Sequence, residues 1–510
     1  MRLRRAALAA TVLAGSVLTG ATMATAPAGA AQNPTVTIRA IDREGKVVAV
    51  TASLQSPVIS PTGIDETLNS AHATRVPRGT YNLAAWIQEP NGSAETLVDR
   101  ELTVSGNTTV TFDARQGHRI LFKVNGDSTV AQDFVLAEPY SPAGWDAFDG
   151  YGGSSSPAVY AVPGTMAPGY ILSLEADLIR PNEFLSPVEY VLVRQLKGKI
   201  PANLTFTVNK ASLASDHVTV KAIDPGKSGG VAFQPIANGN LANLPALPVG
   251  QWAYPPFSID FHFTPGYAWE SQTMSGTDNL NDLPVFGVHS YSQTFDSATF
   301  GPSYQFGPLI GVSQLQTPLP WGDYLFTDPT QQQGTSFGMA VSSGQTWLYE
   351  GTKLLAHKVN GGVSANISGT SHWYTLRVQA NRGSGAVLWK SETLSFNFEA
   401  RADGNNPDTF WPRIIPSGLS LRNAAGPGTT TPVRIYFSDG SDIAAHNAKV
   451  WASVNGGKTW QAVKVSQSGP HWTAVITNPA TAGYVSLRVQ GTNAAGDTAS
   501  VTTINAYAVS

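Results

Sequence analysis

Short runs in which apolar and polar residues alternate, each ended by a glycine or proline turn, recur along the chain from Thr35 onward. In the first run the apolar residues Val36, Ile38 and Ala40 occur at every second position, and a turn at 42–46 follows. A period of two places alternate side chains on opposite faces of a strand, and Gly and Pro form the corners between strands. The pattern predicts an all-β fold made of several tandem β-sandwich modules.

The composition supports the same prediction. Charged residues make up only 13% of the chain, whereas Gly (49) and Pro (34) are plentiful. Exposed helices need Glu, Lys and Arg, so this balance favours sheets whose polar faces carry Thr, Ser and Asn. The chain has no cysteine, which excludes disulfides, thiolate metal sites and a cysteine nucleophile. Stability must therefore come from hydrophobic burial, and 42% apolar residues are enough for several cores.

The N-terminus carries the pattern of an export signal. Arg2, Arg4 and Arg5 precede an apolar stretch at 6–18, and 28–30 is a small-x-small cleavage sequence. We expect residues 1–30 to be a cleaved signal peptide and the mature protein to be secreted and extracellular. Loss of the three arginines changes the formal charge from −3 to −6, which predicts no affinity for nucleic acid. No later apolar run reaches the roughly 18 residues that span a bilayer.

Turn-rich stretches divide the mature chain into four predicted modules. They are a small sandwich at 35–115 that resembles transthyretin-like modules, a β-rich module with long loops at 116–215, an aromatic-rich sandwich at 216–400, and an immunoglobulin-like sandwich at 413–510. The polar, Gly/Asn/Pro-rich stretch at 400–412 predicts a hinge before the last module. Regular short strands between closely spaced turns favour the immunoglobulin-like class for that module.

Ser336 is the one candidate nucleophile, because Gly334–Gly338 matches G-x-S-x-G. A nucleophile elbow requires a helix after the serine. The following residues contain Gly344 and then a strand-like run at 346–349, which predicts a hairpin with 354–357. The histidines and aspartates also lack the contexts of a subtilisin-like triad. We interpret the match as coincidental and assign no catalytic residue; a serine hydrolase using Ser336 stays open as an alternative.

A carboxylate-based hydrolase with a site in the central region is the other enzyme alternative. Glu175, Asp177, Glu183 and Glu189 could supply an acid pair. Spacing in sequence cannot place two carboxylates across a sugar, and lone acids at strand edges are the ordinary explanation. The chain therefore favours a protein without enzymatic activity.

Aromatic residues are the candidates for ligand binding. They are densest at 245–322, and further ones lie in the Gly/Ser/Pro-rich loop region at 141–168. Exposed rings stack on sugars, but alternation through Phe257, Phe261 and Phe263 favours a core strand over a glycan platform. The candidates are Trp145, Tyr151, Trp252, Tyr254 and Trp269.

Two acidic turns could bind calcium. Asp278 and Asp282 form one, and Asp439 and Asp442 form the other. Their carboxylates suit Ca²⁺, although Asp also favours turns for backbone reasons alone. No other cofactor and no metal cluster is expected, because no zinc motif is present.

Several motifs occur in an order that resembles a known family. They are 76–81 (Val-Pro-Arg-Gly-Thr-Tyr), 109–115, 198–202, 263–266, 300–302, the Gly-Lys-Thr-Trp turn at 457–460, and 483–489 ending in Ala506-Tyr507. This succession resembles the region that follows the protease domain in large secreted bacterial subtilases. In that family a catalytic domain comes first, whereas here the signal peptide leads into the first β-module, so no catalytic residue is carried over.

The resemblance implies a secreted, non-catalytic accessory protein. Its expected role is extracellular binding or scaffolding of a protein or of a polysaccharide or other cell-envelope polymer. A partner or inhibitor of a secreted protease is a further alternative.

Overall fold

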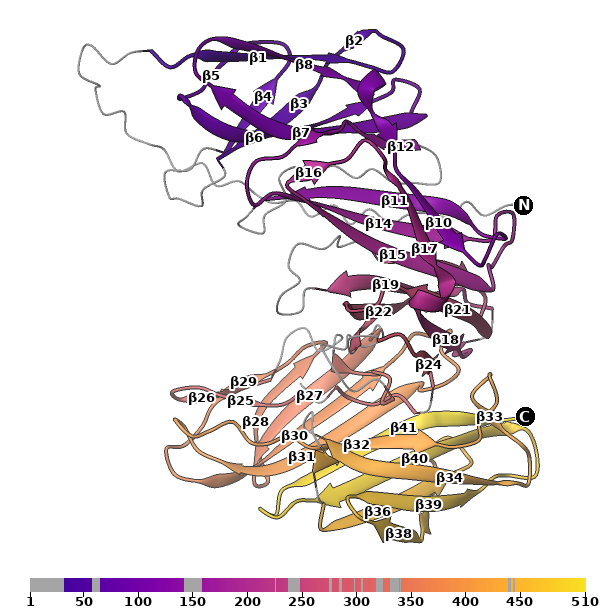
Figure 1. Cartoon of the computed structure of the whole chain (residues 1–510). Helices are drawn as coiled ribbons and strands as arrows, with labels where there is room; N and C mark the ends of the chain where they lie inside the picture. Colours follow the sequence, from indigo (N-terminus) through magenta and orange to yellow (C-terminus); the bar gives the residue numbers. More distant parts are fainter. Residues whose placement is uncertain are drawn as a thin grey trace.

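A computed structural model shows β-modules that follow one another along an elongated molecule (Figure 1). It describes residues 32–56, 65–141, 158–224, 226–236, 248–274, 278–283, 287–297, 299–303, 306–317, 324–330, 339, 341–438, 442–443 and 445–510. Within these residues the helices are short 3-10 turns, η1 (Ala114–Gln116) and η2 (Lys210–Ser212). The predicted all-β fold of tandem sandwiches is confirmed.

The N-terminal module is a sandwich of two sheets. One sheet contains β1 (Thr35–Ile41), β2 (Val47–Val48), β5 (Thr74–Arg75) and β8 (Thr108–Asp113). The other runs in the order β4 (Asp65–Asn69), β3 (Thr51–Gln55), β6 (Gly79–Gln88), β7 (Ala94–Val104), β12 (Ala158–Ala161) and β9 (His118–Arg119). Val36, Ile38 and Ala40 of β1 point into the core between them, as the alternation predicts.

The middle of the chain is built on a central sheet and a small sheet. The central sheet runs in the order β11 (Ala131–Tyr140), β14 (Ile171–Ile179), β15 (Val188–Lys197), β21 (Phe257–Phe263), β18 (Ala214–Val220) and β24 (Ser290–Phe295). The small sheet runs in the order β20 (Val249–Ala253), β19 (Gly229–Ile236), β22 (Ala268–Met274) and β23 (Asp278–Leu283). Two-stranded pairs join β10 (Leu121–Asn125) to β17 (Thr205–Asn209) and β13 (Gly164–Thr165) to β16 (Lys199–Ile200).

The predicted boundary between modules at 215/216 is wrong. Strand β18 crosses it, and β21 pairs on one side with β15 and on the other with β18. One face of the central sheet packs on a core that includes Phe122 and Tyr190, and the other face packs on Phe233 of the small sheet. The predicted second module and the first part of the third are therefore one structural unit.

The C-terminal module is a sandwich of a long sheet and a short sheet. The long sheet runs in the order β28 (Lys353–Val359), β27 (Ser343–Glu350), β30 (His372–Asn381), β31 (Ser391–Ala400), β41 (Thr498–Val509), β40 (Gly483–Thr492), β36 (Asn447–Ser453) and β37 (Gln461–Val463), with β33 (Ala424–Ala425) beside β41. The short sheet runs β32 (Trp411–Pro416), β34 (Thr430–Ser438), β39 (His471–Thr477) and β38 (Val465–Ser468), with β35 (Asp442–Ile443) on β34. A third ladder joins β25 (Leu309–Ile310), β26 (Gln314–Gln316) and β29 (Ser364–Asn366).

Within this module, residues 411–509 have the strand order of an immunoglobulin-like sandwich. When its strands are lettered from β32, the short sheet reads A-B-E-D, and the end of the long sheet reads C′-C-F-G. Val433 and Ile435 of the short sheet share a core with Val485 and Leu487 of the long sheet. The immunoglobulin-like class predicted for 413–510 is confirmed by this topology.

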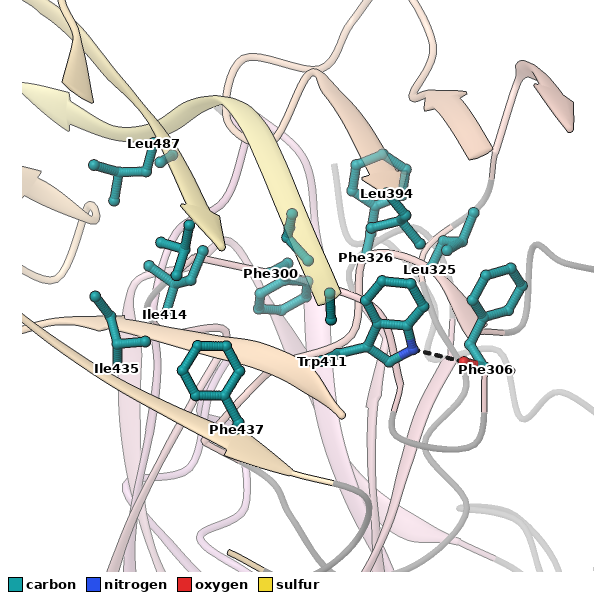
Figure 2. Packing of buried hydrophobic residues seen from close by; sticks show 14 of the residues in the cluster. Phe300, Phe306, Leu325, Phe326, Leu394, Trp411, Ile414, Ile435, Phe437 and Leu487 are labelled. Carbon is teal, nitrogen blue, oxygen red and sulfur yellow. Dashed lines mark hydrogen bonds between the residues drawn. The ribbon is translucent and has the colours of Figure 1, made fainter. Parts of the chain in front are cut away.

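The predicted hinge at 400–412 does not separate two sandwiches. The β31 residues Ser391–Asn397 pair in antiparallel register with the β41 residues Thr498–Ile504, so one sheet continues across the predicted boundary. Phe300 stacks on Trp389 with ring centroids 3.8 Å apart, and the Trp411 indole donates a 2.6 Å hydrogen bond to the Phe306 carbonyl. Figure 2 shows the rings of Phe300, Phe306 and Trp411 packed with side chains of both sheets. Residues 300–509 thus share one hydrophobic core.

The middle unit is fixed to the C-terminal module by the segment between β18 and β19. Ile223 of this segment is buried in the C-terminal core. The Asp224 carboxylate forms an ion pair with Arg382 and accepts a 2.8 Å hydrogen bond from the Val387 amide. Both side chains of the ion pair are less than a tenth exposed, at 8% for Arg382 and 9% for Asp224. The junction is therefore a packed, polar-anchored interface.

Among the described residues no helix is both long enough and apolar enough to span a membrane.

Candidate functional site

Exposed aromatic side chains gather at the edge of the small sheet. Trp252 of the edge strand β20 is 42% exposed, and Tyr254, two residues further on, is 54% exposed. The strand residues on either side of Trp252, Gln251 and Ala253, are buried on the opposite face. Alternation along the strand therefore turns Trp252 outward while the strand itself stays anchored to the core.

Two glycines allow close approaches within the β19–β20 ladder around Trp252. Gly230 faces Trp252 across the β19–β20 ladder, and a Cβ added at Gly230 would lie 3.0 Å from an indole carbon. A Cβ at Gly250 would lie 2.0 Å from the Val231 carbonyl oxygen. Only glycine permits these approaches: Gly230 leaves room for the indole, and Gly250 lets the backbones of β19 and β20 come close together.

Polar side chains lie on the same outward face. In the ladder register Ala232 is opposite Gln272, and Gln234 is opposite Glu270. The Gln234 amide donates a 2.8 Å hydrogen bond to the Glu270 carboxylate. We call Trp252, Tyr254, Gln234, Glu270 and Gln272 the β20 surface. It combines aromatic faces with amide and carboxylate groups, as binding surfaces for proteins and glycans do.

The inward side chain of β20 holds the strand in place. The Gln251 amide donates to the Ser186 carbonyl at 3.2 Å and to the Glu189 carboxylate at 2.6 Å, and its oxygen accepts from the Ser186 amide at 2.6 Å. All three residues are buried. Because these bonds fix the edge strand from below, the aromatic rings above it are displayed on a rigid support.

Trp269 does not belong to this surface, in contrast to the sequence hypothesis. Its side chain is 0% exposed, and its ring lies 4.7 Å from the Phe263 ring in the core between the small and central sheets. It lies on the inward face of β22, where alternation hides it from any ligand at the surface. The candidates Trp145 and Tyr151 lie outside the described residues.

Ser336 also lies outside the described residues, as do residues 337, 338 and 340; the chain is described at Met339 and again from Val341 onward. Strands β27 and β28 form the predicted hairpin, with the turn at Gly351, whose φ is +55°. From Val341 to Val359 the described chain consists of loop, turn and these two strands.

The side chains of the calcium candidates lie outside the described part of the chain. Asp278 and Asp282 belong to β23 and Asp442 to β35, but their side chains, like the whole of Asp439, lie outside that part. Among the described residues no group of three or more His, Asp or Glu side chains is arranged to hold a metal ion. Calcium binding stays a prediction.

The acids weighed as a hydrolytic pair occupy different environments. Glu175 is 0% exposed, and burial, together with the nearby charge of Glu138, raises its pKa well above the ordinary value. Glu183 lies on the surface near Arg180, and Glu189 bonds to Gln251. Glu175 and Glu138 lie on the same face of neighbouring strands, a proximity that the sequence analysis missed. Because Glu175 is sealed from solvent, it cannot meet a substrate in this conformation.

Glu392 is a buried acid with a testable effect on stability. Burial raises its pKa to about 8, against the opposing influence of the Phe326 amide and the Arg413 guanidinium. In the unfolded chain the group loses its proton near its ordinary pKa of 4.5. Between these two values the folded state holds one more proton than the unfolded state, so stability falls as pH rises from about 4.5 to about 8.

Glu392→Gln is therefore expected to stabilise the C-terminal module at pH 7 by about 3 kcal/mol and to leave it unchanged at pH 4. Urea unfolding at both pH values, followed by tryptophan fluorescence, measures this difference. Glu399→Gln, an exposed position of the same strand, is the control and should change neither curve. An unaltered pH dependence in the Glu392 variant would contradict the assignment.

Comparison with known proteins adds no functional argument. No family model and no curated protein matches the chain. Among solved structures, a chimeric titin Z1Z2 has 13% identity over 42% of this chain and 98% of its own, with a TM-score of 0.13. The chicken CNTN1 FN1-FN3 domains have 10% identity over 57% of this chain and 99% of their own, with a TM-score of 0.14. A Salmonella alpha-2-macroglobulin has 9% identity over 94% of this chain and 40% of its own, with a TM-score of 0.19.

Proposed function

We propose that this is a secreted, non-catalytic binding or scaffolding protein that contacts an extracellular protein or cell-envelope polymer through the β20 surface. The observation that carries the proposal is the pair of exposed rings, Trp252 and Tyr254, on a strand anchored from below by Gln251. Tryptophan and tyrosine dominate the energetics of binding surfaces, because they supply a large contact area at little entropic cost.

The proposed relation to subtilase accessory regions rests on the order of the sequence motifs. It is consistent with a chain of tandem sandwiches that present edges and loops. Under this proposal the protein acts outside the cell beside secreted enzymes or the envelope, and the rings at β20 supply the contact.

The double substitution Trp252→Ala with Tyr254→Ala is expected to weaken binding of the physiological ligand by about tenfold to a hundredfold, since each aromatic contact contributes on the order of 1 kcal/mol or more. The wild-type chain is first tested against purified peptidoglycan, a set of insoluble polysaccharides and immobilised culture-supernatant proteins. The double variant is then tested on each surface that binds.

Trp373→Ala is the matched control, because Trp373 is 41% exposed on β30, in a different module. Its binding should equal that of the wild type. If the double variant binds every ligand as tightly as the wild type does, the β20 surface is not the binding surface. Labelling by a fluorophosphonate probe that disappears in Ser336→Ala would instead support the hydrolase alternative.

A further inference from the structure

A pocket of about 170 Å³ lies where the middle unit meets the C-terminal module. Its walls are mainly apolar, and its polar lining comes from an arginine, a tyrosine and a serine. The lining residues are Ala222, Ile223, Gly226, Pro255, Val387, Leu388, Arg422, Ala424, Tyr484, Ala508 and Ser510. A cavity of about 150 Å³ accommodates a six-membered ring, so this pocket has room for one aromatic or large aliphatic side chain.

The walls are held in place by hydrogen bonds across the junction. The Ala222 amide donates to the Leu421 carbonyl at 2.9 Å, and the Asn423 side chain donates to the Ala222 carbonyl at 3.1 Å. On the next wall, the Ala508 amide donates to the Asn423 carbonyl at 3.0 Å. Because these bonds tie several chain segments together, the pocket is formed before any ligand arrives.

The wall formed by Val387 and Leu388 is fixed in the same way. Arg382 donates a 2.9 Å hydrogen bond to the Leu388 carbonyl, while Asp224 accepts from the Val387 amide at 2.8 Å. The Asn505 side chain donates to the Val387 carbonyl at 2.9 Å. A ligand that enters this pocket therefore meets a rigid wall and loses little affinity to reorganisation of the protein.

Charge and exposure at the pocket indicate what it binds. Arg422 is exposed, and within the described chain its guanidinium forms no ion pair. Tyr484 is 37% exposed beside it, and Pro255 follows Tyr254 of the β20 surface directly. Apolar walls favour a hydrocarbon side chain over a hydroxyl-rich sugar, and a free guanidinium favours a carboxylate.

We propose that this junction pocket binds a protein segment that presents an aromatic or large aliphatic side chain next to a carboxylate. The side chain enters the apolar pocket, and the carboxylate pairs with Arg422. This inference rests on the proposed binding function and specifies its partner class. The partner's segment contacts both the β20 surface and the pocket, because Tyr254 of that surface is followed directly by Pro255 of the pocket lining.

Calorimetric titration of the full chain with small probes tests the assignment. N-acetylphenylalanine carries the ring and the carboxylate, its amide carries the ring alone, N-acetylglycine carries the carboxylate alone, and glucuronate carries a carboxylate on a sugar. We expect N-acetylphenylalanine to bind about tenfold more tightly than any of the other three. Arg422→Gln should abolish its advantage over the amide, and Ala508→Leu should reduce binding of both ring-bearing probes by narrowing the pocket.

Arg401→Gln, an exposed arginine that does not line the pocket, should bind all probes like the wild type. The inference is overturned if N-acetylphenylalanine binds no better than N-acetylglycine, or if Arg422→Gln leaves its affinity unchanged. Tighter binding of glucuronate would also overturn it and assign the pocket to a glycan.

The probe titrations and the ligand panel can fail independently. If ligand binding depends on Trp252 but none of the small probes binds, the proposal about the pocket is contradicted and the proposed function is retained. If the probes bind in the expected pattern but the wild-type chain binds no surface of the ligand panel, the proposed role of the β20 surface is contradicted.

Discussion

A fragment of residues 413–510 is expected to self-associate, whereas residues 299–510 remain monomeric. The fragment would lose β31, which pairs with β41 from Thr498 to Ile504, and would leave that edge of the sheet open. It would also lose Trp389, whose indole donates a 3.0 Å hydrogen bond to the Ala506 carbonyl. An exposed, flat edge strand is a template for pairing with another chain.

Size-exclusion chromatography with light scattering at several concentrations measures the difference. The longer fragment contains almost the whole C-terminal core and serves as the control. A monomeric short fragment with a single cooperative unfolding transition would show that the immunoglobulin-like strands are autonomous, against this expectation.

Asp224→Ala is expected to destabilise the chain by about 3 to 5 kcal/mol. It leaves the Arg382 guanidinium buried without its counter-charge, and that is costly because a buried charge loses hydration without compensation. The Val387 amide also loses its acceptor. Chemical unfolding reports the free energy, and small-angle X-ray scattering reports whether the two units separate into a more extended particle.

Two further variants identify the cause. Glu44→Ala removes an exposed ion pair with Lys46 and should cause no measurable change, because water solvates both partners in the variant. The double variant Asp224→Leu with Arg382→Met should recover part of the lost stability, because neither charge then stays buried alone. Equal stability of Asp224→Ala and wild type would show that the pair does not hold the junction.

Local features of this fold could be predicted because their causes lie within a few residues. The alternation of Val36, Ile38 and Ala40 predicts which face of β1 points into the core, and the turn at Gly351 predicts the β27–β28 hairpin. The Gly-Lys-Thr-Trp turn at 457–460 also forms, and the Asn455 side chain accepts a 3.0 Å hydrogen bond from the Thr459 amide within it. In each case the backbone chemistry of the turn and the period of two act together.

The domain boundaries could not be predicted, because they depend on pairings between distant strands. Residues 401–409 do form a polar connection outside the strands, as the composition predicted. Nothing in that stretch shows that β31 pairs with a strand about a hundred residues later. For the same reason β21 was not foreseen beside β15.

The candidate site was predicted in part. Both Trp252 and Trp269 fall in the aromatic-rich tract at 245–322, and only the packing of the small sheet on the central sheet decides that one is exposed and the other buried. The junction pocket had no sequence signal, since Ala222, Arg422 and Ala508 come from segments that only the folded chain brings together.

The position of β41 bears on how the molecule responds to tension. It is bonded along its length to β40 and, over much of it, to β31, in antiparallel register on both sides. A pull applied beyond Val509 acts along the strand and across its ladder bonds, which then resist as a group in shear. Such a tether point withstands stretching better than one at a strand that can be peeled away bond by bond.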